Sequence, residues 1–117
     1  MKAPILACIA SAVILLPPAP AGAVTRSELY AACQAPKKSP SHTFCRAYLV
    51  GHFFGFLAGQ VGMRPMRFCP HDDLPAAEIW AKAEPLFKAR QGQAGDEAAE
   101  TLLAEALFSA YPCEKPK

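Results

Sequence analysis

The sequence predicts an all-α fold, a small four-helix bundle cross-linked by two disulfides. Apolar residues recur at three- and four-residue spacings in several segments, as they do on the buried face of an amphipathic helix. No segment shows the alternation of apolar and polar residues that is typical of a strand, and there is no Asn-Gly turn or internal repeat. Four cysteines follow residue 23, and an even number in a short exported chain indicates two disulfides.

The first 23 residues are expected to be a secretory signal peptide that is removed. Lys2 supplies a positive start, residues 5–16 form an apolar core, and prolines then break it. The last three residues of this segment are small, as signal peptidase requires, so we expect cleavage after Ala23. Cys8 would leave with this peptide, because too few apolar residues precede it for a lipoprotein site.

The mature chain, residues 24–117, is then one small all-helical domain. Without Lys2, its Lys and Arg residues, 12 in the whole sequence, nearly balance its 10 Asp and Glu residues. This near-neutral charge argues against a nucleic-acid partner and against an anionic membrane surface. A domain of this size buries only a little over about 60% of its unfolded surface, so extra constraints on the fold are expected.

The first helix is expected over residues 25–34. Thr25 can cap it, and Glu28, three residues later, completes a capping box. A polar, proline-bounded loop over residues 35–40 then leads into the second helix.

The second helix is the element around which the chain is organised. It is expected to begin near Ser41 and to continue to Gly62, which gives a length of roughly 30 Å. It is apolar almost all round, which predicts burial on every side, yet its apolar run is too short to span a membrane. Phe53 lies on one face, and small residues that recur at every fourth position form a groove on the other: Ala47, Gly51, Gly55 and Gly59.

Two occupants of this groove are considered. Glycine inside a helix costs about 1 kcal/mol relative to alanine, so three in register indicate that something packs closely against them. The favoured interpretation is another helix of the same domain. The alternative is a second copy of the protein. Because one small bundle would struggle to cover both faces of the helix, a homodimer is also expected.

The third helix is expected to follow Asp72 and Asp73, one of which would cap it, with Pro75 in its first turn. Pro85 should end or sharply kink this helix, because proline lacks the backbone N–H and clashes with the preceding turn. Residues 86–95 would then form a loop.

The fourth helix is expected to begin at Asp96 and Glu97, since carboxylates suit the positive end of a helix. Pro112 should stop it directly before Cys113. Its apolar face is formed by Leu102, Leu103, Ala106, Leu107, Ala110 and Tyr111.

Helix direction selects among the three possible disulfide pairings. Cys33 closes the first helix and Cys45 opens the second, so both lie at one end of the bundle. Cys69 lies past the far end of the second helix, and Cys113 returns there if the last two helices form a hairpin. We therefore expect Cys33–Cys45 and Cys69–Cys113. No CxxC motif indicates redox chemistry or a zinc ribbon.

Catalytic chemistry is not indicated. No serine nucleophile elbow, phosphate loop or carboxylate pair of defined spacing is present. The three histidines each have an interpretation other than catalysis or metal binding. His42 lies one helical turn from a cysteine that we expect to be oxidised, and His71 precedes carboxylates that would cap a helix. His52 is interpreted as a helix histidine with a local hydrogen-bond partner. We expect no enzyme activity, no metal site and no cofactor.

An ordered set of motifs resembles a known family. Residues 44–51, Phe-Cys-Arg-Ala-Tyr-Leu-Val-Gly, are similar to the F-C-x-x-Y-[LI]-x-G signature of the Rap/Tai family of type VI secretion amidase immunity proteins. The similarity covers essentially all of the mature chain. It continues through Phe68-Cys69-Pro70, Glu84-Pro85, Ala106-Leu107 and Tyr111-Pro112-Cys113.

The resemblance implies an all-helical periplasmic protein, commonly a homodimer, that binds a peptidoglycan amidase effector and blocks its active site. A toxin that acts in the periplasm needs an exported, disulfide-stabilised antidote, and inhibition needs no catalytic residue. The loop over residues 86–95 is the expected inhibitory surface, with an ordinary surface connector as the alternative. Its candidate effector contacts are Lys88, Arg90, Gln91 and Gln93.

A protein of another class is the alternative function. HdeA-type acid-stress chaperones are also small, disulfide-bonded, helical periplasmic proteins, and an apolar helix would suit one; a structural periplasmic protein is a third possibility. An immunity protein should bind one folded enzyme at neutral pH. A chaperone should bind many unfolded clients at low pH.

Overall fold

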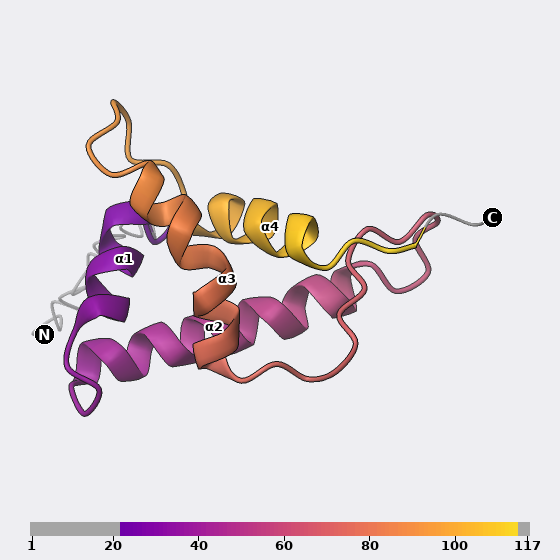
Figure 1. The fold of residues 1–117 in the computed structure, drawn as a ribbon, viewed down its shortest axis with the longest axis horizontal. Helices are drawn as coiled ribbons and strands as arrows, with labels where there is room; N and C mark the ends of the chain where they lie inside the picture. Colours follow the sequence, from indigo (N-terminus) through magenta and orange to yellow (C-terminus); the bar gives the residue numbers. More distant parts are fainter. Residues whose placement is uncertain (1–21, 115–117) are drawn as a thin grey trace, which may run out of the picture.

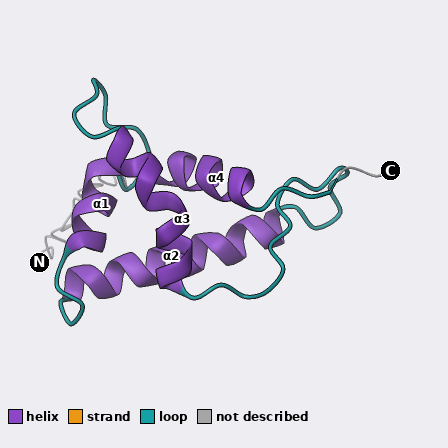
Figure 2. Cartoon of the chain, in the orientation of Figure 1, coloured by secondary structure: helices purple, strands orange, loops and turns teal. Residues whose placement is uncertain are grey.

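The computed structural model describes residues 22–114, and over this range it confirms the all-α prediction, as Figure 1 and Figure 2 show. An isolated bridge between Thr25 and Ala98 is the one pairing of extended backbone in the described range. The predicted signal peptide lies outside the described residues except for Gly22 and Ala23, and Cys8 lies outside them too. The elements are α1 (Arg26–Gln34), α2 (Pro40–Gly59), α3 (Ala76–Ala89) and α4 (Ala99–Ala110).

The predicted capping box begins α1. Thr25 Oγ1 accepts a hydrogen bond from Glu28 N at 3.3 Å, and Glu28 Oε2 accepts one from Thr25 N at 2.9 Å. The two bonds satisfy backbone donors that the first helical turn leaves without partners.

The long helix α2 is buried on one side only, so the prediction of burial on every side is wrong. Ser39 caps it by accepting a hydrogen bond from His42 N at 3.2 Å, and it ends at Gly59, three residues before the predicted Gly62. Cys45, Leu49 and Phe53 are its buried residues. The other helices cover the side that carries these three residues and leave the opposite side exposed.

The start of α3 also differs from the prediction. Pro75 is the N-cap residue rather than part of the first turn, and no side chain makes a capping hydrogen bond there. Asp72 and Asp73 are exposed and precede the cap.

Pro85 does not end α3, which continues to Ala89. Ile79, Ala83 and Phe87 form one buried stripe that runs through this point, and Phe87 is fully buried. Burial of a phenylalanine side chain stabilises by about 1.5–3 kcal/mol, which offsets the backbone hydrogen bond that proline removes. Pro85 lies on the exposed side of the helix, where water can satisfy the freed carbonyl.

The start of α4 is held by the N-terminal segment of the chain. Its N-cap residue is Ala98, so Asp96 and Glu97 precede the helix instead of opening it. Ala99 N donates to Val24 O at 2.8 Å, and Arg26 N donates to Glu97 O at 2.8 Å. These bonds join the beginnings of α1 and α4.

Phe68, in the connector between α2 and α3, completes the hydrophobic core. Its ring centroid lies 5.6 Å from that of Phe53 and 5.5 Å from that of Phe108. The side chain of Gln60 fixes this segment: Oε1 accepts hydrogen bonds from Arg67 N at 3.2 Å and Phe68 N at 3.1 Å, and Nε2 donates to Phe68 O.

The disulfide pairing is the one expected from helix direction. Cys33–Cys45 joins the end of α1 to α2, and Cys69–Cys113 joins the connector to the segment after α4. Figure 1 shows these last two segments side by side beyond the far end of α2, and Cys69 N donates to Tyr111 O at 2.9 Å. No helix in the described range has the length and hydropathy to cross a membrane.

Candidate functional site

The segment between α3 and α4, residues 90–98, projects from the helices, as Figure 1 shows; we call it the projecting loop. Gly92 and Gly95 take φ values of +78° and +84°, a region that glycine enters without steric cost. Gln91 and Gln93 are exposed in this loop. Because α3 extends to Ala89, Lys88 lies in the last turn of that helix and not in the loop.

Arg90 has an intramolecular role that the sequence did not reveal. Its Nη1 donates to both carboxylate oxygens of Glu97 at 3.3 Å, and its Nη2 donates to the two oxygens of Glu105 at 3.0 and 3.1 Å. Such paired, charge-assisted bonds fix orientation as well as adding energy. Arg90 therefore positions the projecting loop against α4.

Arg26 holds the loop from the other side. It is the one buried charged residue among the residues that the structure describes. Its Nη1 lies 3.5 Å from Glu97 Oε1, its Nε lies 3.9 Å from Asp96 Oδ1, and its Nη2 donates to Gln93 O at 3.5 Å. An arginine directly after a helix cap is usually exposed, so the sequence pattern does not predict that Arg26 is buried.

Asp96 links the loop to the first turn of α1. The Ser27 hydroxyl donates to Asp96 Oδ2, and Ser27 N donates to Oδ1 at 3.0 Å. The hydroxyl hydrogen bond, followed by the backbone one, holds the pKa of Asp96 below its usual value. The Asp96 carboxylate, in its ionised form, thus accepts two hydrogen bonds from Ser27 and joins the loop to α1.

The exposed side of α2 is a second candidate surface; we call Ala47, Gly51, Gly55 and Gly59 its open face. A Cβ placed on any of the three glycines would meet no described atom within 4 Å apart from the neighbouring residues and backbone of α2 itself. The favoured interpretation, that another helix of the same domain fills the groove, is therefore wrong for the described chain. Phe53 is not part of this surface, because it is fully buried in the core.

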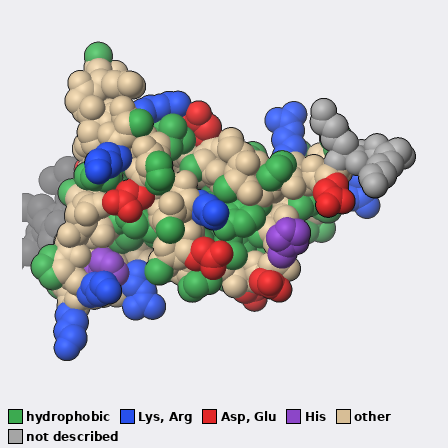
Figure 3. All heavy atoms as spheres, in the orientation of Figure 1, with side chains coloured by type: hydrophobic (Ala, Val, Ile, Leu, Met, Phe, Trp, Pro, Cys, Tyr) green, Lys and Arg blue, Asp and Glu red, His purple; other side chains and the backbone are tan. Residues whose placement is uncertain are grey.

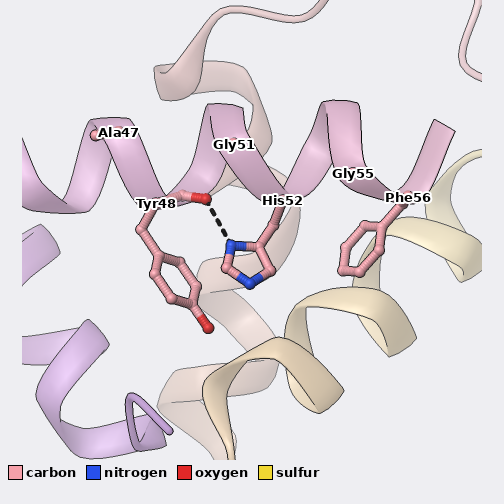
Figure 4. Close-up of a pocket in the computed structure, with 6 residues that line it drawn as sticks. All are labelled: Ala47, Tyr48, Gly51, His52, Gly55 and Phe56. Carbon is pink, nitrogen blue, oxygen red and sulfur yellow. Dashed lines mark hydrogen bonds between the residues drawn. The ribbon is translucent and has the colours of Figure 1, made fainter. Parts of the chain in front are cut away.

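A row of aromatic side chains borders the open face, as Figure 4 shows for Tyr48, His52 and Phe56. His52 Nδ1 donates to Tyr48 O at 2.9 Å, which is the local partner predicted for this histidine. Its Nε2 lies 3.7 Å from Glu100 Oε2 on α4. Burial, and then the nearby Glu100 carboxylate, raise the pKa of Tyr48.

Among the residues that the structure describes, no group of three or more His, Cys, Asp and Glu side chains could hold a metal ion. The two surfaces that stand out are a polar loop and an apolar helix face. Both are suited to contact with a protein.

Comparison with known proteins identifies the family. No significant match is found among curated proteins or among solved structures. The sequence model of the family described as Rap1a immunity proteins matches residues 25–113, a range that contains all four helices and both disulfides. The chain therefore belongs to the Rap1a immunity protein family.

Proposed function

We propose that this protein is a periplasmic immunity protein that binds a type VI secretion peptidoglycan amidase and occludes its active site. Membership of an immunity family implies a protein effector as partner. The projecting loop is the observation that carries the mechanism. Its base is held by Arg26 and Arg90, whereas Gln91 and Gln93 are exposed.

A loop held in this way suits inhibition by insertion. A segment that is ordered before binding loses less conformational entropy on association, so more of the contact energy appears as affinity. Glutamine side chains carry both donors and an acceptor, which match the polar groups that line a peptide-binding groove. The inhibitor then needs only to fill the groove.

The proposed periplasmic location rests on the predicted signal peptide and on the two disulfides. Residues 1–23 have the composition of a signal peptide, although all but the last two lie outside the described range. Disulfides form and persist in oxidising compartments such as the periplasm. Both features support a periplasmic location, which is where a peptidoglycan-cutting enzyme acts.

The test uses oxidised protein spanning residues 24–117 and periplasmic-acting amidase effectors, including any encoded beside its gene. We expect one effector to bind with nanomolar affinity and to stop cleaving peptidoglycan. Replacing Gln91 and Gln93 together by alanine should raise Kd by about tenfold or more, as expected for residues near the centre of an interface. Gln34→Ala, at an exposed glutamine on α1, is the matched control.

Equal affinity of the loop double variant and the Gln34→Ala control would show that the loop is not the contact. Binding to no amidase would contradict the proposed function. Protection of unfolded clients at low pH would then support the chaperone alternative.

We also propose that a second copy of the chain covers the open face of α2. The four residues of this face carry no polar or charged side chain, and two large apolar residues on the same helix, Phe44 and Phe54, are 45% and 48% exposed. Repeated small residues allow two helix backbones to approach closely. The open face thus has the composition of a helix-packing surface with no partner in the described chain.

Leucine at Gly51 and Gly55 is expected to convert the dimer into a monomer without unfolding it. Neither position has a neighbour within 4 Å of a new Cβ, and leucine favours a helix over glycine by about 0.8 kcal/mol at each site. Light scattering coupled to gel filtration measures the mass, and thermal unfolding checks the fold. Ala81→Leu, at an exposed alanine of α3, is the control. A monomeric mass for the unmodified protein at all concentrations would contradict the dimer.

A further inference from the structure

A cleft of about 460 Å³ lies between the α1–α2 turn and the start of α3; we call it the basic cleft. The Cys33–Cys45 disulfide, Leu49 and Trp80 line it with apolar surface. Lys37, His42 and Arg46 line it with basic side chains. Figure 1 places this region at the opposite end of α1 from the projecting loop.

The positive charge of the basic cleft is not neutralised within the described chain. No Asp or Glu lines the cleft, and neither Lys37 nor Arg46 forms an ion pair with a described residue. The sequence has no acidic residue between Glu28 and Asp72, the stretch that contributes Lys37, His42 and Arg46. Figure 3 shows Lys and Arg side chains gathered around a histidine at the end of the molecule that carries the α1–α2 turn.

His42 adds a polar atom that lacks a partner. Its Nδ1 is buried and makes no hydrogen bond with any described residue. A buried polar group without a hydrogen bond costs free energy, so a bound group that reached this nitrogen would remove that cost.

The apolar part of the basic cleft is held rigidly. The disulfide fixes the end of α1 to α2, and the Trp80 ring packs against Tyr30 and Phe87 with centroids 6.1 and 5.3 Å apart. The site therefore exists before any partner binds, which lowers the entropic cost of binding.

We propose that the basic cleft binds an acidic segment of a partner protein that also presents an apolar side chain. The carboxylates of that segment pair with Lys37 and Arg46, and its apolar side chain packs on Trp80 and the disulfide. An apolar site without cations would not favour a partner that carries carboxylates. Cations without an apolar lining would not favour a partner that carries an apolar side chain. The two features together therefore define the chemistry of the partner. The proposal goes beyond the proposed function, because it concerns a separate surface and holds whichever protein is bound.

The test uses tryptophan fluorescence, since Trp80 is the sole tryptophan of the chain and lies in the basic cleft. The probe is an acetylated, amidated pentapeptide with a central phenylalanine between two aspartates on each side. We expect it to shift the Trp80 emission in a saturable manner, with an affinity that falls as sodium chloride is added. Replacing its aspartates by asparagines, or its phenylalanine by alanine, should weaken binding by about tenfold or more.

Two protein variants complete the experiment. Arg46→Glu should weaken binding of the acidic peptide by about tenfold or more, because it removes a cation and adds a repelling charge. Arg64→Glu makes the same change of charge in the exposed connector after α2 and should leave the affinity unchanged. Thermal unfolding of both variants establishes that the fold is retained.

Several results would overturn the proposal. These are absence of saturable binding, equal affinity for the aspartate and asparagine peptides, and equal losses in the Arg46→Glu and Arg64→Glu variants. Equal affinity for the phenylalanine peptide and its alanine version would also contradict the proposal, because the basic cleft would then bind anions without an apolar contact. No amidase enters this assay, so its failure is distinct from failure of the proposed function.

Discussion

Phe68→Ala is expected to destabilise the domain by about 3–5 kcal/mol, the range for removing a large aromatic side chain from a core. The Phe68 side chain is only 1% exposed, and its ring contacts aromatic rings from α2 and α4. Small domains have a total stability of about 5–15 kcal/mol, so this one change removes a large fraction of it. The effect is measured as the difference in the free energy of unfolding in urea, with the oxidised protein in both cases.

Met66→Ala is the matched control for this prediction. Met66 lies two residues earlier in the same connector but is 41% exposed, so its truncation should change stability by less than about 1 kcal/mol. If both variants lost the same stability, Phe68 would not belong to the core. A loss confined to Phe68→Ala would show that this connector is part of the folded domain.

The burial of Phe68 could not be predicted from the sequence. The positions of α1, α2 and α4 follow from local patterns, such as the Thr25–Glu28 capping box and the apolar spacing after residue 98. Phe68 lies in a segment with no helical or strand period, so no pattern marks it as buried. Its burial depends on the Gln60 side chain, whose three hydrogen bonds turn the connector back onto the core.

Two incorrect predictions have the same kind of cause. Pro85 has a strong local preference to end a helix, but the buried Phe87 lies two residues further on and its packing outweighs that preference. The apolar surface of α2 predicts full burial, but the described chain has only enough helices to cover one side. In both cases tertiary packing, and not local propensity, decides the outcome.

The candidate sites were predicted unevenly. The projecting loop follows from the gap between the last two apolar segments, although its boundaries depend on where α3 ends. Its anchoring by Arg26 and Arg90 was not predicted, because each arginine pairs with carboxylates that other parts of the chain contribute. The basic cleft joins Lys37, Arg46 and Trp80, which only the packing of α3 across α2 brings together.

Removing the Cys69–Cys113 disulfide is expected to lower the free energy of unfolding by about 4 kcal/mol, and removing Cys33–Cys45 by about 3 kcal/mol. Both values follow from the entropy that the unfolded chain gains when the closed loop is opened. The difference follows from sequence separations of 44 and 12 residues. Each pair is replaced by two serines, and the two double variants are compared with the oxidised parent by urea unfolding.

The order of the two losses is the informative result. Cys69–Cys113 also ties the connector that carries Phe68 to the chain after α4, where Cys69 N donates to Tyr111 O at 2.9 Å. Its loss therefore frees a core residue as well as a long loop, whereas Cys33–Cys45 joins two helices that meet at one short turn. Equal losses, or a larger loss for Cys33–Cys45, would show that neither chain entropy nor the position of Phe68 governs how the disulfides stabilise this domain.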